Sequence, residues 1–115
     1  ARGVSIDDVA SGAVQGDVLA NTTPVGMGTA ADPSAVERSP VPAACLSSYR
    51  LVFDAVYTPR DTRLLRDAAG AGVATVDGVE MFVRQAAAQF ALFTGVAPPL
   101  AVMRAAVVRS LGEEA

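Results

Sequence analysis

The stretch from Asp77 to Phe93, DGVEMFVRQAAAQFALF, constrains the fold of this chain more than any other. Its apolar side chains recur at three- and four-residue spacing, so at about 100° per residue they share one face of a helix. Asp77 stands where an N-cap belongs, and Glu80 completes a capping-box pattern. The stretch therefore predicts an amphipathic helix with a buried apolar face. The residues on that face are Val79, Phe82, Val83, Ala86, Phe90 and Phe93.

The other faces of this helix carry polar side chains. Glu80 and Arg84 are spaced i,i+4 with the acid first, which suits a solvated surface. Met81, Gln85 and Gln89 fall on the flank between the apolar and the charged faces. A carboxamide at that position is either an ordinary surface residue or a ligand contact.

Short apolar runs indicate three strands. They lie at Asp17–Asn21, Arg50–Tyr57 and Val73–Val76, and the helix from Asp77 follows the third. The first of them, Asp17–Asn21, suits a fully buried parallel strand. Strands that alternate with helices predict an α/β fold with a parallel sheet.

Proline and glycine mark the remaining boundaries. Thr58 and Pro59 suit the N-cap and first position of a second helix, which should end near Gly70 and Gly72. Pro98 and Pro99 precede a last helix, whose end at Glu113 and Glu114 should fray because acids oppose the helix dipole. Two further stretches complete the prediction: a helical turn near Ile6–Val9, and a loop over Thr22–Pro42 with a turn near Pro42.

Three polar segments follow the three predicted strands. They are Asn21–Met27, Tyr57 and the segment that begins at Gly78. In open α/β sheets ligands bind beyond the carboxyl ends of the strands. The pattern therefore predicts a ligand cleft at this rim.

The polar residues at the rim also have plainer interpretations. Asn21, Thr22 and Thr23 are equally typical of a turn that satisfies its own backbone. Tyr57 suits a half-buried ring with its hydroxyl in water. Asp54 at a strand end could act as a general acid or base.

Composition excludes several classes of function. The net charge is −3 with nine arginines and no lysine, and the arginines are scattered, which argues against nucleic-acid binding. With Cys45 alone and no histidine, the chain cannot form an internal disulfide, a histidine-ligated zinc site or a histidine-based triad, so no metal is expected. Gly95, Pro98 and Pro99 interrupt the longest apolar run, so no membrane span is predicted.

Three motifs in order resemble a known family. They are NTTPVGM at 21–27, DAVYTPRDTRLL at 54–65 and GVEMFVRQA at 78–86. Together they resemble the C-terminal part of shikimate dehydrogenases, most of all the plant form fused behind a dehydroquinate dehydratase. This resemblance implies NADP-dependent reduction of 3-dehydroshikimate to shikimate in aromatic amino acid biosynthesis. It also implies a plastid (chloroplast) location for a plant protein, and otherwise a cytoplasmic one.

The resemblance also implies roles for particular residues, among them a structural role for Asp54 beside loop amides. Gly26 would allow close backbone approach beside the nicotinamide half of NADP. The implied cofactor-binding residues are Asn21, Thr22, Thr23, Met27, Ala55, Gly78 and Met81. The implied substrate-binding residues are Tyr57, Gln85 and Gln89, because a polyhydroxylated ring needs groups that both donate and accept hydrogen bonds.

Other parts of the family's site are expected outside this chain. The family's proton-transferring Lys–Asp pair lies in an N-terminal substrate domain, so no catalytic residue is expected here. The Gly-rich turn that holds the cofactor phosphates is expected to be missing, as are the residues that select NADP over NAD. Residues 1–115 are therefore predicted to be a fragment: half of a doubly wound, Rossmann-like NADP-binding domain, with the family's C-terminal helices at about 73–115. The alternatives are a quinate dehydrogenase of the same family and a non-catalytic binding or scaffold remnant.

Overall fold

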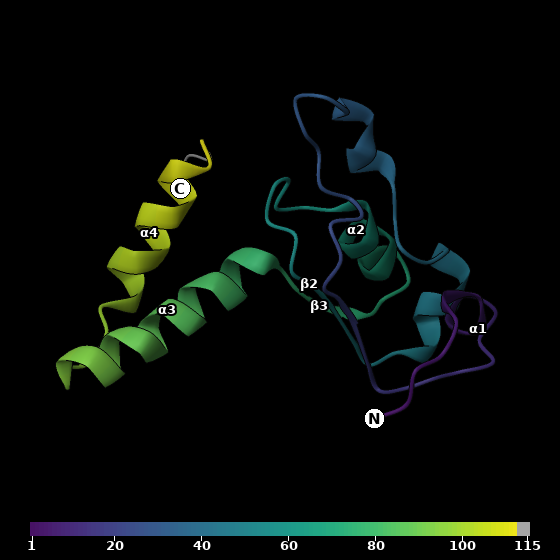
Figure 1. Ribbon diagram of the computed structural model, residues 1–115, viewed down its shortest axis with the longest axis horizontal. Coiled ribbons are helices and arrows are strands. Elements are labelled where there is room, and N and C mark those ends of the chain that lie inside the picture. The colour runs from purple at the N-terminus through teal and green to yellow at the C-terminus, as the bar shows by residue number, and fades with distance from the viewer. Residues whose placement is uncertain (113–115) are drawn as a thin grey trace. The chain divides into compact units, whose positions relative to one another are not determined.

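A computed structural model describes residues 1–112 of the protein (Figure 1). The chain divides into two compact units, Ala1–Asp77 and Gly78–Ala115, which are described separately below. Glu113 and Glu114, which were expected to fray, lie outside the described residues.

The first unit is an α/β structure, as the alternation of strands and helices predicts. Its elements are α1 (Ile6–Ala10), β1 (Val18–Asn21), the 3₁₀ helices η1 (Pro33–Glu37) and η2 (Ala43–Ser48), β2 (Leu51–Asp54), α2 (Arg63–Gly70) and β3 (Ala74–Val76). The three strands form one parallel sheet in the order β1-β2-β3. Asn21 pairs with Asp54 at the carboxyl end of β1 and β2, so the loops that follow these strands leave the sheet at the same edge.

One face of the sheet is covered. Val52 of β2 is fully buried and packs in a cluster with residues of α2 and η2. The buried members of this core cluster are Val41, Leu46, Tyr49, Val52, Leu64, Leu65 and Ala68.

The opposite face of the sheet is apolar but not buried, so the prediction that Asp17–Asn21 forms a fully buried strand is wrong. The register aligns two rows of side chains across the three strands on this face. The rows are Val18, Leu51 and Ala74, and then Ala20, Phe53 and Val76, and none of the six is buried.

The start of α2 differs from the prediction. The helix begins at Arg63 with Thr62 as its N-cap, rather than at Pro59 with Thr58. The reason is the hydroxyl of Thr62, which accepts a hydrogen bond from the Leu65 amide at 3.3 Å and so satisfies a free N–H of the first turn. Residues 58–61 belong to the loop after β2, and the stretch predicted as loop between Thr22 and Pro42 contains η1.

The second unit consists of α3 (Gly78–Thr94) and α4 (Leu100–Ser110), which pack against each other (Figure 1). Glu80 joins them, because its carboxylate accepts hydrogen bonds from Arg84 on α3 at 2.7 Å and from Arg104 on α4 at 2.8 and 2.9 Å. These bonds, from Arg84 first and then Arg104, lower the pKa of Glu80 below its ordinary value. None of the helices in residues 1–112 is both long enough and apolar enough to cross a bilayer.

The buried stripe of α3 is rotated from the predicted face. Val79 and Val83 are fully buried and Ala87 nearly so, which centres the stripe on Val83. Phe82 and Phe93 lie at the edges of this stripe and are 41% and 86% exposed, so the prediction that they are buried is wrong. The apolar pattern located the helix correctly, but it was wider than the surface that packing covers.

Leu64 tests the core of the first unit. Replacing it by alanine should lower the free energy of unfolding by about 2–5 kcal/mol, because Leu64 is 1% exposed and a cavity would remain. Leu92→Ala is the matched control, since Leu92 is 84% exposed and its truncation should change stability by no more than about 0.5 kcal/mol. Urea unfolding followed by circular dichroism measures both. Equal losses would contradict the packing described here.

Candidate functional site

The loops after β1 and β2 enclose a pocket of about 370 Å³. Its lining residues are Thr22, Thr23, Pro24, Met27, Ala55, Val56, Tyr57 and Thr58. We call it the rim pocket, because it lies beyond the carboxyl ends of two neighbouring parallel strands. It brings together five of the residues that the sequence singled out: Thr22, Thr23, Met27, Ala55 and Tyr57.

Asn21 supports the first wall of this pocket, which is the loop after β1, whereas the loop after β2 forms the second wall. Its side chain is 4% exposed, and its amide nitrogen donates to the Val25 carbonyl and to Asp54 Oδ1, both at 3.1 Å. Its amide oxygen accepts from the Thr23 backbone N–H at 3.1 Å and from the Thr23 hydroxyl at 2.7 Å. The side chain of Asn21 thus satisfies its own turn, as the plainer interpretation proposed. A contribution of Asn21 to cofactor binding stays a prediction.

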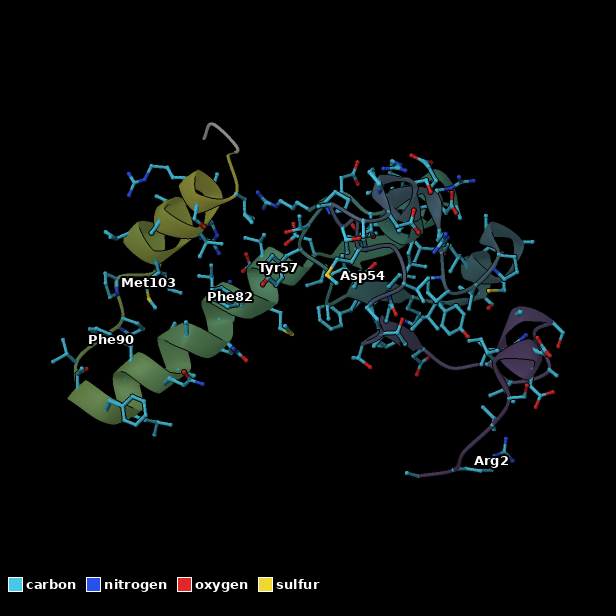
Figure 2. The ribbon with its side chains drawn as sticks, turned by 45° about the horizontal axis from the view of Figure 1, so that its top comes forward. Arg2, Asp54, Tyr57, Phe82, Phe90 and Met103 are labelled. Atoms are coloured by element: carbon cyan, nitrogen blue, oxygen red, sulfur yellow. The ribbon has the colours of Figure 1, made fainter. Side chains whose placement is uncertain are left out.

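Asp54 lies inside the first unit, among the strands and loops that surround it (Figure 2). Its side chain is completely buried, and both carboxylate oxygens accept hydrogen bonds. Oδ1 accepts from Asn21 Nδ2 at 3.1 Å and from the Val56 N–H at 3.0 Å, and Oδ2 accepts from the Thr62 hydroxyl at 2.7 Å. Among the described residues, no buried side-chain nitrogen or oxygen lacks a hydrogen-bond partner. This arrangement supports the structural role over that of a general acid or base.

Tyr57 follows Asp54 by three residues and contributes to the second wall of the pocket. Tyr57 is 46% exposed, which agrees with the half-buried interpretation and also leaves its ring accessible in the pocket wall. An exposed phenol in a pocket wall can both donate and accept hydrogen bonds. Its role in binding substrate stays a prediction.

The loop after β1 also depends on a glycine. Gly26 has φ +97°, a conformation that side-chain-bearing residues rarely adopt, and a Cβ here would lie 3.1 Å from the Arg38 carbonyl oxygen. The resemblance implied that Gly26 lets a cofactor approach closely. At its Cβ position, the group that approaches closely is the chain's own backbone at Arg38.

The same loop contains the spacing G-x-G-x-x-A, from Gly26 to Ala31. In dinucleotide-binding proteins a turn with this spacing leads directly into an α-helix, and the N-terminus of that helix binds the pyrophosphate. Here the next element is the five-residue 3₁₀ helix η1, and its N-cap Asp32 is acidic. The segment therefore does not have the structural context of a phosphate site.

The remaining predicted site residues lie on α3 in the second unit. Gly78 is buried, whereas Met81, Gln85 and Gln89 are exposed. They recur at spacings of three, four and four residues, so they form one stripe along the helix. Their roles in binding cofactor and substrate stay predictions.

Two features escaped the sequence analysis. Thr62 was not recognised as a partner of Asp54, because the helix start was placed four residues too early. Arg60 Nε donates to Asp77 Oδ2 at 2.8 Å, which ties the loop after Tyr57 to the last residue of the first unit. The sequence offered no signal for this pair, since its members are 17 residues apart and no helical periodicity joins them.

Comparison with known proteins identifies the family. The family model for the Shikimate 5'-dehydrogenase C-terminal domain matches residues 78–108. A bifunctional 3-dehydroquinate dehydratase/shikimate dehydrogenase of Arabidopsis thaliana, named as chloroplastic, is 57% identical over 84 residues, which are 73% of this chain and 13% of the relative. A shikimate dehydrogenase (NADP(+)) of Methanocella arvoryzae is 42% identical over 101 residues, covering 88% of this chain and 35% of the relative.

Solved structures agree with this assignment. A quinate dehydrogenase from Corynebacterium glutamicum in complex with NAD matches with a TM-score of 0.78 and 33% identity, over 94% of this chain and 36% of that one. A shikimate 5-dehydrogenase from Thermus thermophilus in complex with NADP(H) and shikimate matches with a TM-score of 0.75 and 30% identity, over 95% and 38%. The fold is thus that of the Rossmann-like dehydrogenases. The chain belongs to the shikimate dehydrogenase family, and it spans between an eighth and two fifths of the length of the relatives named here.

Gly26 gives a test of the pocket's first wall. Gly26→Ala should destabilise the protein by more than the about 1–2 kcal/mol that a left-handed conformation costs an alanine, because the new methyl group also meets the Arg38 carbonyl. Gly72→Ala is the matched control: its φ is +75°, but nothing lies within 4 Å of its Cβ position. Thermal unfolding of both variants measures the difference. A loss at Gly72 as large as that at Gly26 would show that the contact is unimportant.

Proposed function

We propose that this chain is the segment of an NADP-dependent shikimate dehydrogenase that carries the nicotinamide-side loops and part of the substrate-binding site. The observation that supports this most is the rim pocket. Five residues expected on family grounds to bind cofactor or substrate line one pocket, and this pocket lies where α/β sheets bind ligands.

The residues of the rim pocket suit one half of a dinucleotide. Ligand pockets span about 300–1,000 Å³, and this pocket is at the small end of that range. Thr22 and Thr23 bring polar groups to it, while Pro24, Met27 and Val56 bring apolar surface. NADPH would supply the hydride for 3-dehydroshikimate, and the apolar surface would exclude water from the ring that carries it.

Substrate binding is proposed for Tyr57, Gln85 and Gln89. The phenol and the two carboxamides offer both donors and acceptors, which is what the hydroxyl groups of shikimate need. Gln85 and Gln89 are one helical turn apart on α3, so both can face one ligand. The backbone of Ala55 and Gly78 and the side chain of Met81 are proposed to border the cofactor.

Proton transfer is proposed to come from residues that are not in this chain. The family's general acid–base pair is a lysine and an aspartate, and this sequence contains no lysine. A substrate domain N-terminal to these residues is the proposed source of that pair. In this arrangement residues 1–115 form part of an NADP-binding domain, with the family's C-terminal helices within about 73–115.

A second candidate, quinate dehydrogenase, is favoured by one observation. A quinate dehydrogenase with NAD is among the similar solved structures, with a TM-score of 0.78 and 33% identity. The two enzymes share a hydride transfer and differ in the alcohol that they oxidise. A plastid location goes with the plant form of the proposal and is supported by the chloroplastic relative from Arabidopsis thaliana.

Gln85 tests the substrate role. In a chimera in which this chain replaces the matching segment of the Thermus thermophilus enzyme, Gln85→Ala should lower kcat/KM for shikimate by about 5- to 150-fold, because one hydrogen bond in a closed site contributes about 1–3 kcal/mol. The KM for NADP should change far less. Steady-state kinetics with both substrates varied measure this. Gln15→Ala is the matched control on an exposed glutamine outside the proposed site.

An unchanged kcat and KM for shikimate in Gln85→Ala would remove Gln85 from the site. The same chimera compares quinate with shikimate. A preference of this chimera for quinate over shikimate, absent from the parent enzyme, would favour the second candidate over the first.

Residues 1–115 alone should not oxidise shikimate. Positioned proton transfer contributes about 10²–10⁴-fold to catalysis, and the proposed lysine is not in this chain. The absorbance of NADPH at saturating shikimate measures turnover, with a protein-free blank and the active chimera as controls. Turnover by this chain that is abolished by Gln85→Ala would show that it holds a complete site, contrary to the proposal.

A further inference from the structure

We propose that Asp54 is a positioning residue: its buried carboxylate holds the two walls of the rim pocket in place relative to each other. This inference rests on the proposed function only for the identity of the ligand. The geometry that supports it lies entirely within the first unit.

The first wall is attached to Asp54 through Asn21. Asn21 Nδ2 donates to Asp54 Oδ1 at 3.1 Å and to the Val25 carbonyl at 3.1 Å. The oxygen of the same side chain accepts two hydrogen bonds from Thr23. The turn that contains Thr22, Thr23 and Pro24 is therefore held at Thr23 and at Val25 by one side chain, and that side chain is itself hydrogen-bonded to Asp54.

The second wall is attached to the same oxygen atom. The Val56 N–H donates to Asp54 Oδ1 at 3.0 Å, and Val56 and its neighbour Tyr57 both line the pocket. Because both walls meet at Oδ1, a shift of this atom changes the spacing between them. The other oxygen, Oδ2, accepts from Thr62, whose hydroxyl also caps α2. Oδ2 thus anchors the carboxylate to the body of the unit.

Strand pairing does not account for this arrangement. β1 and β2 are already paired up to Asn21 and Asp54, and the Ala55 N–H donates to the Asn21 carbonyl at 2.9 Å. A buried carboxylate is also a costly way to fill a core, since apolar residues of similar volume often serve stability as well or better. What the carboxylate adds is one hydrogen bond from the loop after β2, at Val56, and one from the side chain of Asn21, which in turn holds the loop after β1 through Val25.

The two oxygens allow a matched pair of variants. Asp54→Ala removes the contacts to both walls. Thr62→Val removes only the hydrogen bond to Oδ2 and the cap of α2, and it leaves the donors to Oδ1 unchanged. Both variants should lower the melting temperature, so a stability effect alone does not distinguish them. Asp54→Asn is the conservative variant, because its amide oxygen can still accept from Asn21 and Val56.

The experiment uses the full 115-residue chain labelled with ¹⁵N, at a temperature where each variant is folded. Hydrogen exchange of the Val56 amide reports the second wall, and amide shifts of Thr23 and Tyr57 report the pocket. In Asp54→Ala, exchange at Val56 should rise by about ten-fold or more and both amide shifts should move. In Thr62→Val these signals should stay near those of the unmodified chain, and Asp54→Asn should restore them in large part.

Equal changes in Asp54→Ala and Thr62→Val, or unchanged pocket signals in Asp54→Ala, would overturn the proposal and leave Asp54 a residue of fold stability alone. If Asp54→Ala does not fold, Asn21→Ala replaces it: the Thr23 shift should then move while Val56 exchange stays slow, and a Thr23 shift that does not move would overturn the proposal.

A titration with NADP⁺ separates this proposal from the proposed function. Binding that perturbs Thr22 and Tyr57 and weakens by about ten-fold in Asp54→Ala supports both. If the unmodified chain shows no shifts with NADP⁺, the cofactor part of the proposed function loses support, while the exchange and shift measurements still decide the role of Asp54.

Discussion

The buried carboxylate of Asp54 is the interaction on which the described site depends. It joins the end of β2 to the loop after β1 through Asn21, to its own following loop through the Val56 amide, and to the start of α2 through Thr62. A buried charge is tolerated only when its hydrogen bonds are made, and here three donors meet it. Asn21 is 33 residues from Asp54, whereas Val56 and Thr62 are 2 and 8 residues away, so one group joins the end of β1 to two positions in the segment that follows β2.

The sequence predicted the first unit in outline, because its strands are short, apolar and bounded by polar residues. β1, β2 and β3 all fall within the predicted runs, and their parallel direction was predicted from their alternation with helices. The start of α2 was wrong because Thr58-Pro59 and Thr62 both fit the signals of a helix N-terminus. Thr62 is the N-cap that forms: its hydroxyl accepts from the Leu65 amide and also donates to Asp54, and this second bond is a tertiary contact that no local pattern contains.

The candidate site was predictable to different depths. The gathering of Thr22, Met27 and Tyr57 at one rim followed from the rule that parallel strands end at the same edge. Residue types could not show that the side-chain amide of Asn21 hydrogen-bonds to its own turn, because the same group can equally well hydrogen-bond to a ligand. On α3, periodicity located the helix, but Phe82 and Phe93 showed that an apolar stripe in sequence can be wider than the surface that neighbours cover.

The open face of the sheet, opposite the core cluster, affects how this polypeptide behaves when other molecules are present. Two aligned rows of apolar side chains, with Phe53 at the centre of one of them, are left partly open to water. Removing such a surface from water is favourable whatever covers it, because the hydrophobic effect is not directional. What covers this face therefore depends on the protein concentration. In dilute solution the nearest apolar surface is a segment of the same polypeptide, and in concentrated solution it is another molecule.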